Sequence, residues 1–483
     1  ASAEYRELYE VIATDATAAG TSVLSEAPSL RCGLFSWNSA PALYALPTAL
    51  LIEEDECDVN RILSWNRGSG ELTTLFGGRE PPNAGYAAVR LRHRAEALVE
   101  RVDESSGETQ LWRTDGTWDG TRYLRPMPEP LQISSIQLAV QGKALYSPSW
   151  PSPSLRALDL ATYEDSEVTA FVSPSTPDYR IHPAGELGYF FVRRAGYFDE
   201  VGAPLELWRT TGSTPGTFLV AGLVGGYRWA GEIVDLGGSA VFLVATLDGT
   251  TELWRSDGTL PGTGVIASFA TPSSSGLGLD RLGGYVFFQG RDEAHGEELW
   301  RTDGTAAGTA LLLDLTPGPA GSVLPWSAAG ERYLYFTAGQ VDPLPALWVS
   351  DGTTQGTRLI VSAWDSGPAS PFALGTPDGG ERLYFSAESP EAGFELWQVD
   401  ASSGVVRRVA DLWPGPASSF PQDFMALGDV LLFTADDGVH GRELWALPPA
   451  GTPCVASGTR ACLLGDRFAA ELVWKDGTAA PAR

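Results

Sequence analysis

The sequence predicts an all-β fold, namely a closed β-propeller built from four-stranded blades. Three observations lead to this prediction. One phrase recurs along the chain at intervals of about 46–49 residues, which is typical of propellers and solenoids. Glycine (55 residues) and proline (34 residues) are abundant, and no long stretch has the 3.6-residue apolar period of a helix. The two ends of the repeat array also look complementary to each other.

The recurring phrase is clearest at residues 298–309, which read ELWRTDGTAAGT. Other full copies begin at Gln110, Glu252 and Ala346, and degraded copies begin at Glu206, Glu395 and Glu443. Together with two weaker units of similar spacing, they indicate about nine units between residues 25 and 447. Eight units is the alternative, if one weak unit is an insertion.

Each unit is expected to hold four strands. In the unit around Trp348 we predict strands at 322–326, 332–337, 346–349 and 357–361. The Asp-Gly-Thr segment lies between the third and fourth strands, where Asp and Gly suit a tight turn. The second strand recurs at 188–192, 240–244, 285–288, 382–385 and 430–433, and the weak units keep apolar runs at 42–44, 61–65, 71–75, 144–146 and 155–158.

The ends of the array predict how it closes. The last unit leaves the pattern after Leu447 without a fourth strand, whereas residues 15–24 resemble the turn and fourth strand of a unit. A first strand that completes the last blade leaves no open sheet edge, which favours a closed propeller over an open solenoid. We therefore divide the chain into a closing segment (1–24), a propeller (25–447) and a C-terminal tail (448–483).

These phrases resemble those of the bacterial ELWxxDGT-repeat proteins, large secreted or surface proteins of myxobacteria and related bacteria. The likeness extends to about residue 447 and includes companion segments at 314–319 and 411–416. It implies a propeller-type repeat and an extracellular location. It implies no established activity and no catalytic residues.

The tail lies outside the repeat and resembles the opening of a small β-domain found at the ends of many secreted bacterial proteins. Phe468, Leu472 and Trp474 lie on one side of an alternating strand with no obvious partner. The strand either folds back on the propeller, belongs to a longer domain that is trimmed here, or serves as an assembly strand that pairs with another molecule.

The charge and composition limit the range of partners. The net charge is −27, which disfavours nucleic acid and anionic membranes and favours cations or basic partners. No apolar run is long enough to span a bilayer. The start at Ala1 and the low lysine content suggest a mature secreted or cell-surface protein whose signal peptide has been removed.

Four cysteines fit an oxidising compartment and predict two local disulfides, Cys32–Cys57 and Cys454–Cys462. Four cysteines allow three connectivities, and four free thiols are the other alternative.

The sequence lacks the familiar catalytic signatures, including HExxH, a Walker loop and the G-x-S-x-G elbow. His295 and His440 occupy the same place in their units, as a repeated loop residue would. One Trp recurs at one strand position, which predicts packing between neighbouring sheets rather than ligand binding. These packing residues are Trp112, Trp208, Trp254, Trp300, Trp348, Trp397 and Trp445.

Metal binding enters the prediction in two forms. The Asp of each complete turn could bind calcium, although a turn that satisfies its own Asp needs no ion. These candidates are Asp115, Asp257, Asp303 and Asp351. Carboxylates also gather between the predicted second and third strands, for example at 53–58 and 292–293, and would make one face of a propeller strongly acidic. No other cofactor is expected.

The sequence supports three functions. We expect a non-enzymatic extracellular scaffold, adhesion or surface-structure protein that binds a protein or a cell-surface polymer, with self-association through the C-terminal strand. The first alternative is a lectin-like or divalent-cation-dependent binding propeller. The second alternative is a propeller hydrolase or lyase with a carboxylate-based site near the axis. Short insertions, the longest at 53–58 and 197–204, disfavour an enzyme.

Overall fold

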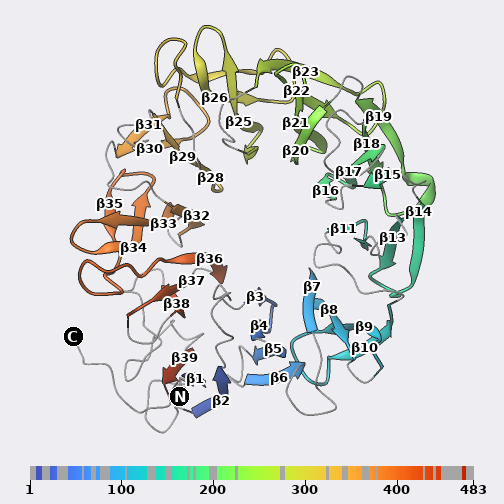
Figure 1. The fold of residues 1–483 in the computed structure, drawn as a ribbon, viewed down its shortest axis with the longest axis vertical. Helices are drawn as coiled ribbons and strands as arrows, with labels where there is room; N and C mark the ends of the chain where they lie inside the picture. Colours follow the sequence, from blue (N-terminus) through green and yellow to red (C-terminus); the bar gives the residue numbers. More distant parts are fainter. Residues whose placement is uncertain are drawn as a thin grey trace, which may run out of the picture. The chain divides into compact units, whose positions relative to one another are not determined.

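The computed structural model describes most of the chain between Glu7 and Trp474. The described residues are 7–13, 22–29, 42–56, 59–66, 72–76, 87–103, 106–127, 138–146, 154–170, 175–177, 181–194, 204–223, 227–271, 278–322, 326–339, 346–361, 369–376, 379–427, 430–438, 442–447 and 470–474. They are almost entirely β-strand (Figure 1). No helix among these residues is both long and apolar enough to cross a bilayer.

The strands form antiparallel sheets in which most strands pair with the next one along the chain. Two compact units divide the chain, at 1–130, 385–397 and 408–483 for the first and at 131–384 and 398–407 for the second.

The first unit contains four sheets. They are β2-β1-β39 (Ser22–Ser29, Glu7–Ala13, Ala470–Trp474), β3 to β6 (Ala42–Ala45, Ala49–Glu56, Val59–Asn66, Leu72–Phe76), β7 to β10 (Ala87–His93, Glu96–Val102, Thr109–Thr114, Arg122–Pro126) and β36 to β38 (Gln422–Leu427, Val430–Asp436, Arg442–Leu447).

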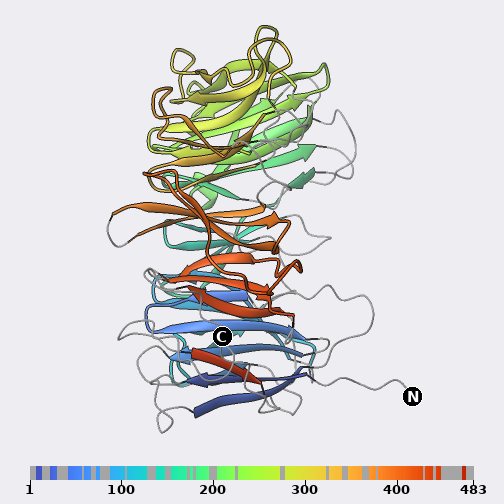
Figure 2. The same ribbon diagram turned by 90° about the vertical axis from the view of Figure 1, so that its left-hand side faces the viewer.

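The second unit contains five sheets, stacked face against face where the ribbon is green and yellow (Figure 2). They are β11 to β14 (Leu138–Val140, Lys143–Tyr146, Ser154–Asp159, Asp165–Ala170), β15 to β19 with η1 (Ser175–Pro177, His182–Ala184, Leu187–Arg194, Leu205–Thr210, Thr214–Gly216, Phe218–Leu223), β20 to β23 (Tyr227–Leu236, Ser239–Thr246, Thr250–Ser256, Thr263–Ala270), β24 to β27 (Asp280–Leu282, Tyr285–Asp292, Gly296–Thr302, Ala310–Leu313) and β28 to β31 (Ser327–Ala329, Leu334–Ala338, Ala346–Ser350, Arg358–Val361). A further sheet, β32 to β35 (Ala369–Gly375, Glu381–Ser389, Gly393–Asp400, Val406–Arg408), contributes residues to both units.

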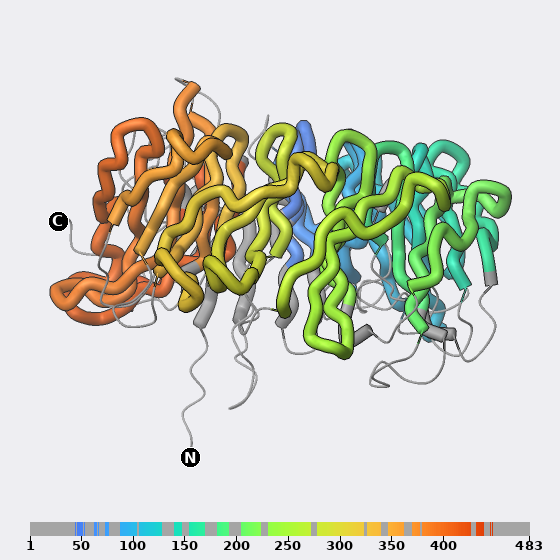
Figure 3. The backbone as a smooth tube through the Cα atoms, turned by 90° about the horizontal axis from the view of Figure 1, so that it is seen from above, coloured from blue at the N-terminus to red at the C-terminus, as the bar shows by residue number. Residues whose placement is uncertain are grey.

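The register repeats from sheet to sheet. The Trp of each phrase lies opposite an apolar residue of the second strand, as Trp254 does opposite Phe242 and Trp348 opposite Phe336. A register shift recurs between the Leu and the Trp of the phrase where the third strand meets the fourth, for example between Leu299 and Trp300. The tube in Figure 3 follows this up-and-down course through the green and yellow sheets.

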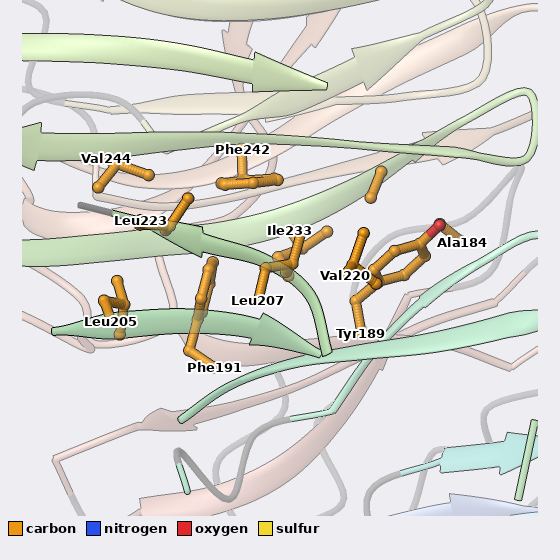
Figure 4. Packing of buried hydrophobic residues seen from close by; sticks show 11 residues of the cluster. Ala184, Tyr189, Phe191, Leu205, Leu207, Val220, Leu223, Ile233, Phe242 and Val244 are labelled. Carbon is orange, nitrogen blue, oxygen red and sulfur yellow. The ribbon is translucent and has the colours of Figure 1, made fainter. Parts of the chain in front are cut away.

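The core of the second unit lies between the sheets, because the strands turn apolar faces toward their neighbours. In one cluster Phe191 and Leu207 of one sheet pack against Ile233 and Phe242 of the next (Figure 4). The rings of Phe191 and Phe242 meet edge to face at 5.4 Å.

The predicted strands are largely confirmed, with two corrections. Residues 53–56 were expected on a loop, but they belong to β4, where Glu53 faces the N–H of Val89 at 3.0 Å. The first strand of the Trp348 unit was expected at 322–326, whereas β28 occupies Ser327–Ala329. Glutamate-rich and proline-containing segments obscured both strands, because these residues are rare in strands.

The N-terminal strand pairs with a different partner from the one predicted. Residues 15–24 were expected to complete the sheet of β38, but β1 pairs with β2 and with β39 of the tail. Residues 14–21 lie outside the described part of the chain. The strands β1 and β39 therefore share one sheet, and its C-terminal strand comes from the tail rather than from the last repeat.

Candidate functional site

The Asp-Gly-Thr turn is held by its own side chains. Oδ1 of Asp303 accepts hydrogen bonds from the N–H of Thr305 at 2.8 Å and from its hydroxyl at 2.7 Å. That hydroxyl in turn accepts the N–H of Gly308 at 2.9 Å, and the hydroxyls of Thr302 and Thr309 meet at 2.8 Å. The same Asp–Thr hydrogen bonds occur at Asp115, Asp257 and Asp351. Calcium at these four residues stays a prediction, and their local bonds already account for the recurring Asp.

The turn also links neighbouring sheets. The guanidinium of Arg301 donates to the carbonyl oxygen of Gly352, the glycine of the next copy of the phrase. At the corresponding glycine of the degraded copy that begins at Glu206, Lys143 donates to Gly212 O at 3.0 Å. The repeated Arg and Gly are therefore explained by architecture.

Five of the seven recurring Trp residues pack between sheets, and the other two make contacts within their own sheets. Trp254 packs against the cluster that contains Phe191, and the Trp300 ring lies 5.0 Å from Phe269 of the preceding sheet, edge to face. Equivalent packing is seen for Trp112, Trp208 and Trp348. Trp445 is only 1 % exposed and stacks on Phe433. Trp397 donates its indole N–H to Ala387 O at 3.0 Å.

The side chains of the remaining predicted site residues lie outside the described part of the structure. Cys32, Cys57, Cys454, Cys462 and Phe468 lie outside the described residues. Leu472 and Trp474 belong to β39, where they lie opposite Val11 and Tyr9 of β1. Self-association through this strand stays a prediction.

A group of polar residues that the sequence did not single out lies on the first strands of the second unit. The strands β20, β24 and β28 lie side by side and carry Glu232, Asp280 and Ser327 respectively. The Ser327 hydroxyl donates a hydrogen bond to Oδ2 of Asp280. Glu232 lies within a register shift of β20, between Ala230 and Ile233. A β-bulge of this kind redirects a side chain, and bulges are frequent next to active sites.

Asp280 and Glu232 lie in different environments. Burial raises the pKa of Asp280, and the negative charge of Glu232 raises it further, against the lowering effect of the Ser327 hydrogen bond. The Glu232 side chain is exposed. Two carboxyl groups in different environments, one half-buried and one exposed, are a pair that can perform general acid–base catalysis. Ser327 occupies Oδ2, so Oδ1 is the oxygen left to carry the proton.

A second carboxylate feature that the sequence did not reveal is the Glu of the phrase itself. Glu298 and Glu395 are completely buried, and burial raises the pKa of each to about 7. Both accept hydrogen bonds from the companion segment that follows the fourth strand, namely from Thr316 N at 2.9 Å and from Leu412 N at 2.8 Å. The companion segment could have indicated this contact, because it recurs only after these two phrases.

One of the histidines, His295, forms a hydrogen-bonded pair with Asp292. Nδ1 of His295 lies 2.8 Å from Oδ2 of Asp292, and this hydrogen bond raises the pKa of His295. His440 lies outside the described residues. Within the described ranges no three His, Cys, Asp or Glu side chains gather as metal ligands.

No family model and no curated protein matches the chain. Several solved structures do. A puromycin hydrolase is 13 % identical, with 83 % of this chain covering 59 % of that one at a TM-score of 0.40. Porphyromonas gingivalis dipeptidyl peptidase 4 is 9 % identical, with coverages of 90 % and 71 % and a TM-score of 0.48. The β-propeller domain of the trilobed protease from Pyrococcus furiosus is 11 % identical, with coverages of 68 % and 100 % and a TM-score of 0.34.

These comparisons correct the predicted function. The sequence led us to expect a non-enzymatic scaffold, but the solved structures that match include a hydrolase, a peptidase and a domain of a protease. The expectations of a scaffold and of a protein without enzymatic activity are therefore withdrawn. The chain spans less than two thirds of the length of the puromycin hydrolase, and this level of similarity assigns neither activity nor substrate.

Proposed function

We propose that the protein is a β-propeller hydrolase whose acid–base pair is Asp280 and Glu232. The observation that carries the proposal is the different environment of these two carboxylates on adjacent first strands, one half-buried and hydrogen-bonded, the other exposed. Enzymes commonly obtain an acid and a base from two carboxyl groups in this way.

In this proposal Asp280 is the general acid. Its raised pKa keeps Oδ1 protonated closer to neutral pH, so it can protonate a leaving group as a bond to nitrogen or oxygen breaks. Glu232 is the general base, and it takes a proton from the attacking water. Ser327 is a positioning residue, because its hydrogen bond to Oδ2 fixes the rotation of the Asp280 carboxyl group.

The test is turnover of chromogenic substrates by the full chain. Peptide nitroanilides and aryl glycosides both release a leaving group that a general acid can protonate. We expect hydrolysis of at least one class, with a fall in kcat of about 100-fold or more in Asp280→Asn and Glu232→Gln. The control is Asp119→Asn, which changes an exposed carboxylate in a turn of the first unit and should leave kcat unchanged.

Two outcomes would count against the proposal. One is the absence of turnover by the wild type with every substrate. The other is turnover that survives both the Asp280 and the Glu232 substitutions. A fall in kcat in Ser327→Ala that is smaller than in Asp280→Asn, together with an alkaline limb of the pH profile that moves to higher pH, would support the positioning role, because the Ser327 hydrogen bond lowers the pKa of Asp280.

We also propose that the sheets are blades of one propeller of about nine units, closed through the sheet that β1 shares with β39. Its support is the nine successive sheets from β3 to β38 and the pairing of the two terminal strands. An extracellular location with local disulfides is consistent with this proposal and stays a prediction.

A further inference from the structure

Glu298 contains a buried oxygen without a hydrogen bond. Its Oε1 accepts from Thr316 N at 2.9 Å and from the Ser322 hydroxyl at 3.1 Å. The side chain is 0 % exposed, yet Oε2 has no hydrogen-bond partner, although the N–H of Leu315 is close enough to lower the pKa of this carboxyl group. A buried carboxylate oxygen in this state is costly and calls for an explanation.

A second such oxygen lies nearby. Oδ1 of Asp314 is buried and also has no hydrogen-bond partner. The charge of Asp314 raises the pKa of Glu298, after burial itself, so the two carboxylates interact. The charges of both groups also contribute to raising the pKa of His295, whose largest cause is the hydrogen bond to Asp292. Glu298 and Asp314 are therefore two interacting carboxylates, each with one buried oxygen that has no hydrogen-bond partner.

The segment after β27 encloses this environment. Ser322 donates its N–H to Glu297 O at 2.6 Å, and its hydroxyl meets that of Thr316 at 2.8 Å. Gly321 has a φ of +65°, and a Cβ there would lie 2.1 Å from Glu297 N, so the segment approaches β26 as closely as only glycine allows. The hydroxyls of Thr316 and Ser322 and the backbone at Gly321 thus lie next to Glu298 and its neighbour Glu297.

The other copy of the phrase and its companion lacks these features. Glu395 uses both oxygens, because Oε2 accepts from Leu412 N and the Ser419 hydroxyl at 2.8 Å each and Oε1 accepts from Trp413 N at 3.2 Å. Asp411 is exposed and lies 3.8 Å from the guanidinium of Arg408. The unsatisfied pair is therefore specific to the Glu298 copy and is not a property of the repeat.

We infer that Glu298 and Asp314 form a binding site for a hard divalent cation of the calcium class. Oε2 of Glu298 and Oδ1 of Asp314 are the two carboxylate ligands. Calcium takes six to eight oxygen ligands and accepts hydroxyls, backbone carbonyls and water beside carboxylates, which suits a site with only two acidic side chains. Binding would neutralise the paired charges and fix the segment 314–322 on β26. The inference is independent of the proposed hydrolase, because it concerns other residues.

The experiment measures calcium binding by the full chain after dialysis against a chelator. The readouts are the melting temperature and calorimetric titration with CaCl2 up to roughly 10 mM, a range that covers weak extracellular sites. We expect a saturable rise in melting temperature and one titratable site, with a weaker response to MgCl2 at equal ionic strength.

Matched variants identify the residues. Asp314→Asn should abolish the calcium-dependent rise, as should Glu298→Gln, while Asp411→Asn, the equivalent change in the other copy, should retain the rise in full. If Glu298→Gln does not fold, Asp314→Asn alone decides, because Asp314 lies on the connecting segment outside the strands. No saturable rise in the wild type, a rise that persists in Asp314→Asn, or an equal loss in Asp411→Asn would overturn the inference.

Discussion

The recurring Asp, Gly and Thr of the turn each take part in specific local hydrogen bonds. The Asp and the two Thr of one turn bond to each other, and the hydroxyl before the Asp accepts the N–H of the following Gly, as Thr302 does for Gly304 at 3.0 Å. The degraded copy keeps this chemistry with other residues, because the hydroxyls of Thr211 and Ser213 meet at 2.9 Å where the Asp is missing. The repeat is thus preserved by hydrogen bonding.

The first prediction concerns the turn Asp. Asp303→Ala removes the acceptor of two hydrogen bonds and should lower the free energy of unfolding by about 1 kcal/mol. Asp303→Asn keeps a side-chain oxygen and should lose less than half of that amount. Urea unfolding measures both, and equal losses in the two variants would show that the charge rather than the acceptor matters.

The second prediction concerns Glu395 and pH. Its pKa is raised from 4.5 to about 7, chiefly by burial. A raised folded-state pKa means that the stabilisation is fully present below pH 4.5 and is lost as the pH rises to 7. Glu395→Gln does not titrate, so its free energy of unfolding should fall less than that of the wild type between pH 5 and 8, by on the order of 1 kcal/mol. Urea titrations at both values test this, with the exposed Glu391→Gln as a control that should follow the wild type.

At the scale of the element, the turn glycine joins one sheet to the next. Gly258 has a φ of +84°, and a Cβ there would lie 2.6 Å from Cδ1 of Leu187 in the preceding sheet. The glycine therefore serves both the turn conformation and the close approach of two sheets.

The third prediction separates these two roles. Gly258→Ala should lower the free energy of unfolding by about 2–4 kcal/mol, because it combines positive φ with a steric clash. Gly249→Ala has the same conformational strain at a φ of +88° but meets no atom within 4 Å, so its loss should be about 1 kcal/mol. Thermal and urea unfolding measure the difference, and equal losses would contradict the role in sheet contact.

The fourth prediction concerns the recurring Trp. Trp300→Ala should lower the free energy of unfolding by about 3–5 kcal/mol, because the ring packs on Phe269 and on the core of the preceding sheet. Trp118→Ala is the matched control, since this ring lies in a turn and is 61 % exposed. A loss of unfolding free energy in Trp300→Ala as small as that in Trp118→Ala would contradict the packing role of Trp300 and favour ligand binding instead.

The elements were predictable where apolar residues alternate and turns are explicit. The strands β17, β21, β25 and β29 follow runs of aromatic and β-branched residues, and the phrase marks the third strand and its turn. The strand β4 was missed because its second half, Glu53–Glu56, is entirely acidic, although Glu53 is held by Tyr44 Oη at 3.1 Å and Val89 N. Tertiary contacts of this kind are not visible in a local pattern.

For the whole molecule, the order of the sheets was predictable from the repeat, but the candidate site was not. Asp280 and Ser327 are separated by 47 positions and belong to no motif, so only the neighbouring placement of β24 and β28 brings them together. Their pairing depends on packing between sheets, which the period of a repeat does not specify. The same applies to Glu298 and its companion segment, whose buried contact was hidden in a phrase that looked purely structural.

The fifth prediction tests the pairing of the terminal strands. Val11 lies opposite Leu472 in the register of β1 and β39, a spacing that suits a disulfide. Val11→Cys with Leu472→Cys should form a cross-link that peptide mass mapping identifies and that raises the melting temperature, while Val11→Cys with Ala470→Cys, which are out of register, should cross-link far less. Equal yields for the two pairs would contradict the register.

The pairing of β1 with β39 has a consequence for biogenesis. The strand β1 is translated more than four hundred residues before its partner β39 at Ala470–Trp474. Until β39 has been translated, one edge of β1 lacks this strand partner, and such an unpaired edge can form wrong hydrogen bonds with other nascent chains. The sheet of β1 is therefore completed only after β39 has been translated, and a product that ends before Ala470 contains the repeats but lacks the strand that pairs with β1.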